Sequence, residues 1–151
     1  MKKLFTILMM SFLVLSACSK GGEDGVRTGK YGMMSEETPQ YRAVVFLRAV
    51  YDDDNIDRVV EMSTKRLGRI IKGFHTNKNV QRQLFSLRLD TMSTEPVSGG
   101  SMLFSERQEK ADIEMKIIGH YGGKKITELK TLSLVKVGGD WKVDDVTDTV
   151  P

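Results

Sequence analysis

Cys18 is the one cysteine of the 151-residue chain, and its surroundings give its thiol a distinctive setting. It follows Ser16, Ala17 and a mostly apolar run of 12 residues, which itself follows two lysines. A charged start, an apolar stretch and small residues before a cleavage point are typical of a secretory signal. Twelve residues are too few for a helix to span a bilayer. A lone cysteine also excludes disulfides and Cys-ligated metal sites in the rest of the chain.

This arrangement resembles the signal of bacterial lipoprotein precursors. The resemblance implies cleavage between Ala17 and Cys18, a diacylglyceryl group on the Cys18 thiol and acylation of the new amino terminus. Because burial contributes only about 0.8 kcal/mol per methylene, one fatty chain anchors marginally, whereas two or three make release slow. In bacteria whose lipoproteins are sorted between two membranes, a residue other than Asp after the lipidated cysteine implies the periplasmic face of the outer membrane, and here that residue is Ser19. The alternative is an ordinary cleaved signal that leaves Cys18 as a free thiol.

The composition after this signal gives no reason to expect a nucleic-acid partner. The formal charge of +3 includes Lys2 and Lys3, so the chain from Cys18 onward has 21 basic and 20 acidic side chains. It is therefore nearly neutral. A secretory signal would also export the protein from the compartment that holds nucleic acid. We expect no nucleic-acid binding.

The chain divides into a signal (1–17), a lipidated cysteine with a tether (18–37) and a single domain (38–151). The tether contains five glycines and no apolar periodicity, so it is predicted to be flexible and to span on the order of 25 Å. The 114 residues of the domain suffice for one hydrophobic core but not for two.

Three helices are predicted at the start of the domain. Thr38 followed by Pro39 is a helix start, and this helix runs to about residue 51. A short second helix includes residues 56–60. The third is capped by Ser63 or Thr64 and ends near residue 75. Its apolar residues recur on one face and are predicted to be buried: Leu67, Ile70, Ile71 and Phe74.

The period of the apolar residues changes after Val80. Phe85, Leu87 and Leu89 alternate with polar residues and predict a strand, although residues 79–87 also fit a helix. Alternation is clearer over residues 110–120, where one face is apolar and the other polar.

Two Gly-Gly turns, at residues 122–123 and 138–139, join the last predicted strands. These strands cover residues 125–137 and 141–146. Helices first and strands afterwards predict an α+β fold, in which N-terminal helices pack on one face of a curved antiparallel sheet.

The end of the chain carries a second resemblance. The segment from Leu134 to Val143, LVKVGGDWKV, follows three predicted helices. It is similar to the ending of small bacterial lipoproteins with the nuclear transport factor 2-like fold, also called cystatin-like, over about residues 38–148. The resemblance implies a cone of sheet and helices whose mouth holds a ligand, an active site or nothing. It also implies that the sheet can pair with a second copy, here through residues 125–137.

Few residues have the setting of a catalyst. Asp112 and Glu114 lie on the polar face of their predicted strand, so no carboxylate is assigned to an apolar interior that would raise its pKa. Neither His75 nor His120 lies in a zinc-binding spacing or beside a nucleophile. The pattern favours binding over catalysis. The alternative is a small-molecule-binding protein or enzyme with an apolar pocket lined by Tyr41, Tyr51 and Trp141.

An acidic stretch between the first two predicted helices raises the possibility of a hard-cation site: Asp52, Asp53, Asp54 and Asp57. The calcium-loop template fails, because its glycine position, counted from Asp52, holds Asp57 and its final glutamate position holds Ser63. Capping of the second helix explains the stretch better. We predict no metal and no other cofactor.

One charge pattern exceeds the background. Between Ser63 and Leu89 the chain has no acidic residue and seven basic ones: Lys65, Arg66, Arg69, Lys72, Lys78, Arg82 and Arg88. On a helix, Lys65, Arg69 and Lys72 share one side, away from the apolar face. Such a face predicts binding to an envelope protein or an anionic surface component, with about 1 kcal/mol per contact near a charged membrane. The alternative is a solvated face balanced by acidic residues near the C-terminus.

Overall fold

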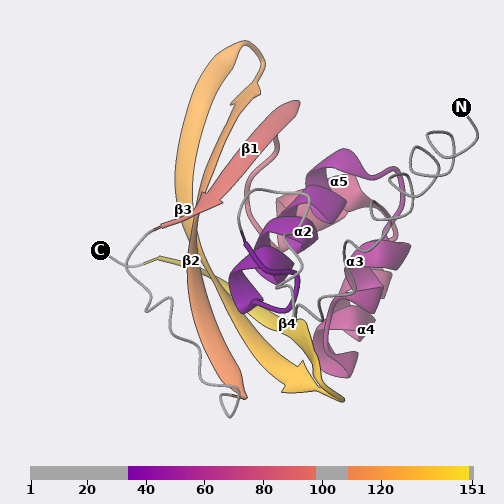
Figure 1. Cartoon of the computed structure of the whole chain (residues 1–151). Coiled ribbons are helices and arrows are strands. Elements are labelled where there is room, and N and C mark those ends of the chain that lie inside the picture. The colour runs from indigo at the N-terminus through magenta and orange to yellow at the C-terminus, as the bar shows by residue number, and fades with distance from the viewer. Residues whose placement is uncertain (1–33, 98–108, 150–151) are drawn as a thin grey trace, which may run out of the picture.

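Helices cover one face of a four-stranded antiparallel sheet (Figure 1). The computed structural model describes residues 34–97 and 109–149, so the signal, Cys18 and most of the tether lie outside the described residues. The elements, in chain order, are α2 (Pro39–Asp52), α3 (Asp57–Glu61), α4 (Lys65–Phe74), α5 (Asn77–Gln83), β1 (Thr91–Pro96), β2 (Lys110–Tyr121), β3 (Lys124–Val137) and β4 (Asp140–Asp148).

The sheet is a meander in which each strand pairs with the next, in the order β1-β2-β3-β4. Both predicted Gly-Gly turns are present, and all four of their glycines have positive φ, as tight hairpins require. The predicted alternation along β2 is also confirmed, because its apolar face is buried: Ala111, Ile113, Met115 and Ile117. The predicted α+β class is therefore confirmed.

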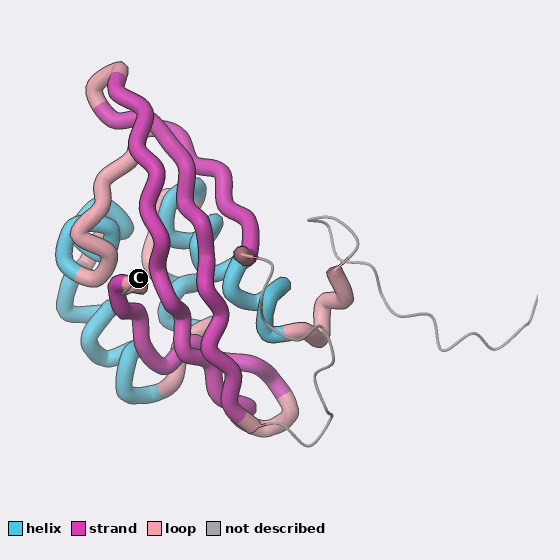
Figure 2. Tube along the Cα trace, turned by 90° about the vertical axis from the view of Figure 1, so that its left-hand side faces the viewer, coloured by secondary structure: helices cyan, strands magenta, loops and turns pink. Residues whose placement is uncertain are grey.

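The helix α2 lies against the sheet and contacts all four strands. The Thr38 hydroxyl accepts a hydrogen bond from the Tyr41 amide at 3.3 Å, and Pro39 occupies the first turn, as predicted. Phe46, Leu47 and others on its inner side are fully buried in the core. Figure 2 shows the strands side by side with the helices behind them. The sheet thus has one covered face.

The strand predicted over residues 85–89 is wrong. The chain instead forms α5, overlapping the helical alternative, and β1 begins only after an irregular segment. Phe85 is buried because its ring packs against those of Phe46 and Tyr51, with centroids 6.4 and 5.9 Å away. The alternation therefore reflects a loop packed on α2, not a strand.

The third predicted helix is α4, and its apolar face is buried only in part. Thr64 caps it, with Oγ1 accepting from the Leu67 amide at 3.3 Å. Leu67 and Ile71 are buried, but Ile70 is 44% exposed, against the prediction. Ile70 stands about 100° around the helix axis from Ile71, which turns it out of the contact with the rest of the domain.

Two buried polar side chains hold α5 against the end of α2. Asn77 Nδ2 lies 2.7 to 3.1 Å from three backbone oxygens, those of Ala49, Asp53 and Asn55. One turn later, Gln81 Nε2 donates to a further α2 carbonyl at 3.1 Å. The last carbonyls of a helix have no intrahelical donor. These two side chains supply donors there.

We expect Asn77→Ala to lower the free energy of unfolding by about 2 kcal/mol or more, because it leaves buried carbonyl oxygens without a donor. Urea unfolding followed by circular dichroism measures the change. The exposed neighbour provides the control, since Lys78→Ala is expected to change stability by less than about 0.5 kcal/mol. Equal effects of the two substitutions would contradict this role of Asn77.

Candidate functional site

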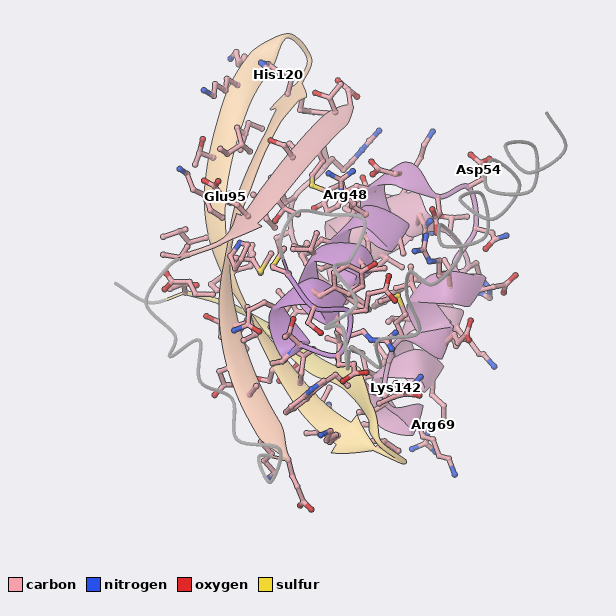
Figure 3. The ribbon with its side chains drawn as sticks, viewed as in Figure 1. Arg48, Asp54, Arg69, Glu95, His120 and Lys142 are labelled. Carbon is pink, nitrogen blue, oxygen red and sulfur yellow. The ribbon has the colours of Figure 1, made fainter. Side chains whose placement is uncertain are left out.

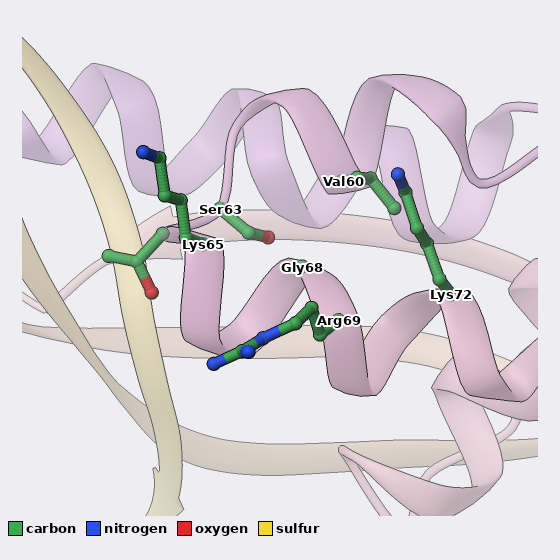
Figure 4. A pocket seen from close by; sticks show the side chains of 7 residues that line it. Val60, Ser63, Lys65, Gly68, Arg69 and Lys72 are labelled. Carbon is green, nitrogen blue, oxygen red and sulfur yellow. The ribbon is translucent and has the colours of Figure 1, made fainter.

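A pocket of about 460 Å³ lies between α3 and α4 (Figure 4). Its volume is in the range of small-molecule sites, about 300 to 1,000 Å³. The lining residues all come from residues 60–72: Val60, Ser63, Thr64, Lys65, Gly68, Arg69 and Lys72.

Gly68 leaves room for this pocket. A Cβ atom at this position would lie 3.4 Å from the Val60 carbonyl oxygen and 3.5 Å from Val60 Cγ1. The helices α3 and α4 are thus close together here, and no side chain from residue 68 fills the space beside them. The Val60 side chain and Gly68 make this part of the lining apolar.

Three cationic side chains border the pocket. Lys65, Arg69 and Lys72 leave successive turns of α4 around Gly68 (Figure 4), and Arg69 points away from the sheet (Figure 3). Within residues 34–97 and 109–149, none of the three forms an ion pair. Like charges at these spacings repel by about 0.2–0.5 kcal/mol per pair, and the helix dipole disfavours cations in the first turn. An anion in the pocket would relieve both.

Arg66, on the same helix, has a different environment. Its Nη2 donates to the Asp144 carbonyl oxygen at 2.5 Å and lies 3.3 Å from Asp144 Oδ2. Thr64 Oγ1 donates to Asp144 Oδ1 at 2.7 Å. This bond from Thr64 and, to a smaller extent, the guanidinium of Arg66 lower the pKa of the Asp144 carboxyl. The guanidinium of Arg66 is therefore paired with Asp144 of β4, and Arg66 does not line the pocket.

The connection between α3 and α4 is also joined to β4 through the backbone. The Thr64 amide donates to the Val143 carbonyl at 2.8 Å, and the Val143 amide donates to the Met62 carbonyl at 2.9 Å. Ser63 and Val143 thus form a parallel bridge. Because Thr64 is also the N-cap of α4, these bonds determine where that helix begins.

Two more of the seven basic residues, Lys78 and Arg82, lie on α5 and do not line the pocket. Arg82 Nη2 donates to Asn79 Oδ1 at 2.6 Å. The structure thus separates the seven basic residues into three at the pocket, one paired with β4, two on α5, and Arg88, whose guanidinium carbon lies 5.2 Å from the centroid of the Tyr121 ring.

The three aromatic residues of the predicted apolar pocket do not all lie together. Tyr41 and Tyr51 are near opposite ends of α2, roughly 15 Å apart along the axis. The Tyr51 hydroxyl donates to the Leu87 carbonyl at 2.9 Å, and burial raises the pKa of its phenol. Trp141 is only 5% exposed, with Lys136 Nζ 5.7 Å from its ring centroid. None of the three lines the pocket between α3 and α4.

The acidic stretch after α2 has structural contacts. Asn55 Oδ1 accepts from the Asp57 amide at 3.0 Å, and Arg58 pairs with Asp53 at 3.4 Å. In the described part of the chain, no three His, Cys, Asp or Glu residues are grouped to hold a metal ion. Neither histidine belongs to such a group in the described residues. His75 ends α4 with φ 64°, and His120 lies toward the far end of β2 (Figure 3).

None of the helices in the described ranges is long and apolar enough to cross a membrane. A comparison of the chain with protein families found no match, and neither did a comparison with curated proteins. The function must be inferred from the residues themselves.

Sequence reasoning missed the uncharged part of the pocket lining, formed by Val60, Ser63, Thr64 and Gly68. One signal was present in the sequence. A glycine inside a helix costs about 1 kcal/mol relative to alanine, so Gly68 indicates close packing or a functional reason for a missing side chain.

Gly68→Ala and Gly73→Ala are both expected to raise the free energy of unfolding by about 0.5–1 kcal/mol, because alanine restricts the unfolded chain more than glycine does. A methyl group at residue 68 would meet only ordinary contacts, and at residue 73 it would meet nothing within 4 Å. Urea unfolding measures both. If Gly68→Ala destabilised the protein while Gly73→Ala stabilised it, α3 and α4 would be packed more tightly at Gly68 than described.

A second prediction concerns Asp144. Because its pKa is lower in the folded than in the unfolded state, its carboxylate adds stability above the unfolded value of about 3.9 and loses this contribution as the pH falls through the folded value. We expect Asp144→Asn to be less stable at about pH 7 and to lose less stability on acidification. Urea unfolding across this range provides the measurement. Asp54→Asn, at an exposed position, is the matched control, and it should lower stability at about pH 7 less than Asp144→Asn does.

Proposed function

We propose that this protein is a bacterial lipoprotein, anchored through Cys18, whose single domain binds an anionic component of the cell envelope without catalysing a reaction. The domain would lie at the periplasmic face of the outer membrane, held by the tether of residues 18–37. The setting of Cys18 in the sequence supports the anchor: a charged start, an apolar run and small residues before the cysteine.

The proposal includes a nuclear transport factor 2-like fold for residues 38–151. The α+β architecture supports it, with helices first and a four-stranded meander after them. A further support is the final hairpin, where the Gly138-Gly139 turn places Lys136 opposite Trp141. Folds of this kind host several functions, so the binding role is inferred from the site alone.

The observation that carries the binding role is the pocket with three cations that form no ion pair in the described chain. Exposed charges usually contribute little on their own. Here Lys65, Arg69 and Lys72 share a concave surface, so that one anion can interact with several of them. Asp144 neutralises Arg66 on the same helix, but no described carboxylate performs that role at the pocket.

The experiment has two arms. In the first, the wild-type chain and Cys18→Ser are expressed in a bacterial host. The wild type should fractionate with membranes and carry the mass of a diacylglyceryl group, whereas Cys18→Ser should do neither.

In the second arm, the full chain with Cys18→Ser is mixed with envelope fragments purified from cells that lack the protein. Reversal of all three pocket charges (Lys65→Glu, Arg69→Glu and Lys72→Glu) should lower co-sedimentation about tenfold or more. The matched control reverses three exposed charges elsewhere: Lys78→Glu, Lys124→Glu and Lys125→Glu. Equal losses would show that net charge, and not the pocket, causes binding.

A further inference from the structure

We propose that the pocket between α3 and α4 binds a phosphomonoester on a body about the size of a sugar. This inference rests on the proposed function and names the chemistry of its ligand. The site is formed by Lys65, Arg69 and Lys72 together with the uncharged lining around Gly68.

The number of cations favours a phosphomonoester over a carboxylate. A phosphomonoester carries about −1.5 to −2 charges near neutral pH and offers three strong acceptor oxygens. A carboxylate carries one charge on two oxygens. Three cationic side chains at one pocket therefore match the phosphate in both charge and number of acceptors.

The kinds of cation also suit this ligand. The guanidinium of Arg69 is a planar fork that can donate two parallel hydrogen bonds to phosphate oxygens. Lys65 and Lys72 stand on either side of it along α4 and add compact charges with rotatable donors (Figure 4). Such charge-assisted bonds are stronger than bonds between neutral groups.

The size and uncharged lining of the pocket indicate what the phosphate is attached to. A volume of about 460 Å³ lies in the range of sites for whole small molecules, about 300 to 1,000 Å³, and exceeds the needs of a single phosphate group. Val60 and Gly68 supply apolar surface for carbon–hydrogen groups. Ser63 Oγ donates to the Val59 carbonyl at 2.7 Å, which leaves its lone pairs free to accept from a ligand hydroxyl.

The carboxylates of α3 do not compete with a ligand for the pocket cations. Asp57 and Glu61 lie on α3, and neither lines the pocket nor comes within 4 Å of its three cations. They therefore leave the three cations available to a ligand. The expected ligand thus has one dianionic end and a neutral, hydroxylated body.

Calorimetric titration of the full chain carrying Cys18→Ser tests the inference, with glucose-6-phosphate as the probe. We expect saturable binding of this probe and none of glucose or galacturonate. Arg69→Gln and Lys72→Gln should each weaken binding about tenfold or more, since each removes a charge-assisted contact. The control Lys78→Gln should change the affinity by less than about twofold.

Two substitutions that leave the net charge unchanged test where the body of the ligand lies. Gly68→Ala adds a methyl group to the lining and should weaken glucose-6-phosphate binding more than inorganic phosphate binding. Gly73→Ala makes the same change outside the pocket and should affect neither. Similar losses for both probes in Gly68→Ala would contradict the proposed place of the sugar-sized body.

Vesicles distinguish a lipid headgroup from a free metabolite as the source of the phosphate. Phosphatidylcholine vesicles receive equal negative charge from phosphatidic acid, a monoester, or phosphatidylglycerol, a diester. Arg69-dependent binding to the first alone identifies a lipid monoester and contradicts the sugar-sized body, whereas binding of glucose-6-phosphate alone identifies a soluble ligand.

Several results would overturn the inference. One is equal affinity for galacturonate and glucose-6-phosphate; another is binding of neither probe nor vesicle. If envelope capture still depends on Lys65, Arg69 and Lys72, only the phosphomonoester assignment fails. If envelope capture does not depend on these three residues either, the proposed function fails as well.

Discussion

The position of α4 relative to the sheet depends on two backbone hydrogen bonds between the α3–α4 connection and β4. They join Met62 and Thr64 to Val143, on either side of the bridge at Ser63. Thr64 is held twice, because its side chain also donates to Asp144 while it caps α4. A helix that begins at a fixed point of the sheet places its later residues at fixed positions too. The pocket is thus a consequence of how α4 is docked.

Local signals were sufficient to predict most of the fold. The Gly-Gly turns and the alternation along β2 and β3 depend on neighbouring residues alone, and Thr38 with Pro39 marks the start of α2 without reference to the rest. Phe85 was misread because its burial arises from contacts with Phe46 and Tyr51, more than thirty residues away in the chain. The spacing of apolar residues along the sequence does not reveal such contacts.

The site was predictable to a smaller extent. The spacing of Lys65, Arg69 and Lys72 shows that they share a helix side. Which cations remain available, however, depends on distant partners: Arg66 is paired with Asp144, 78 positions away. The pocket itself depends on α3 lying against α4 at Gly68, and a pattern of charges contains no information on that approach. Tertiary structure separates cations that look equivalent in sequence.

The pocket lining comes from one short segment, residues 60–72. This segment belongs to the helices that cover one face of the sheet. In evolutionary terms, such a site is easily gained and lost. A chain with uncharged side chains at the exposed positions 65, 69 and 72 could keep the caps, the hairpins and the core while its binding surface disappears. Domains that share this architecture therefore need not share this site, and its presence in any of them has to be established from the residues at these positions.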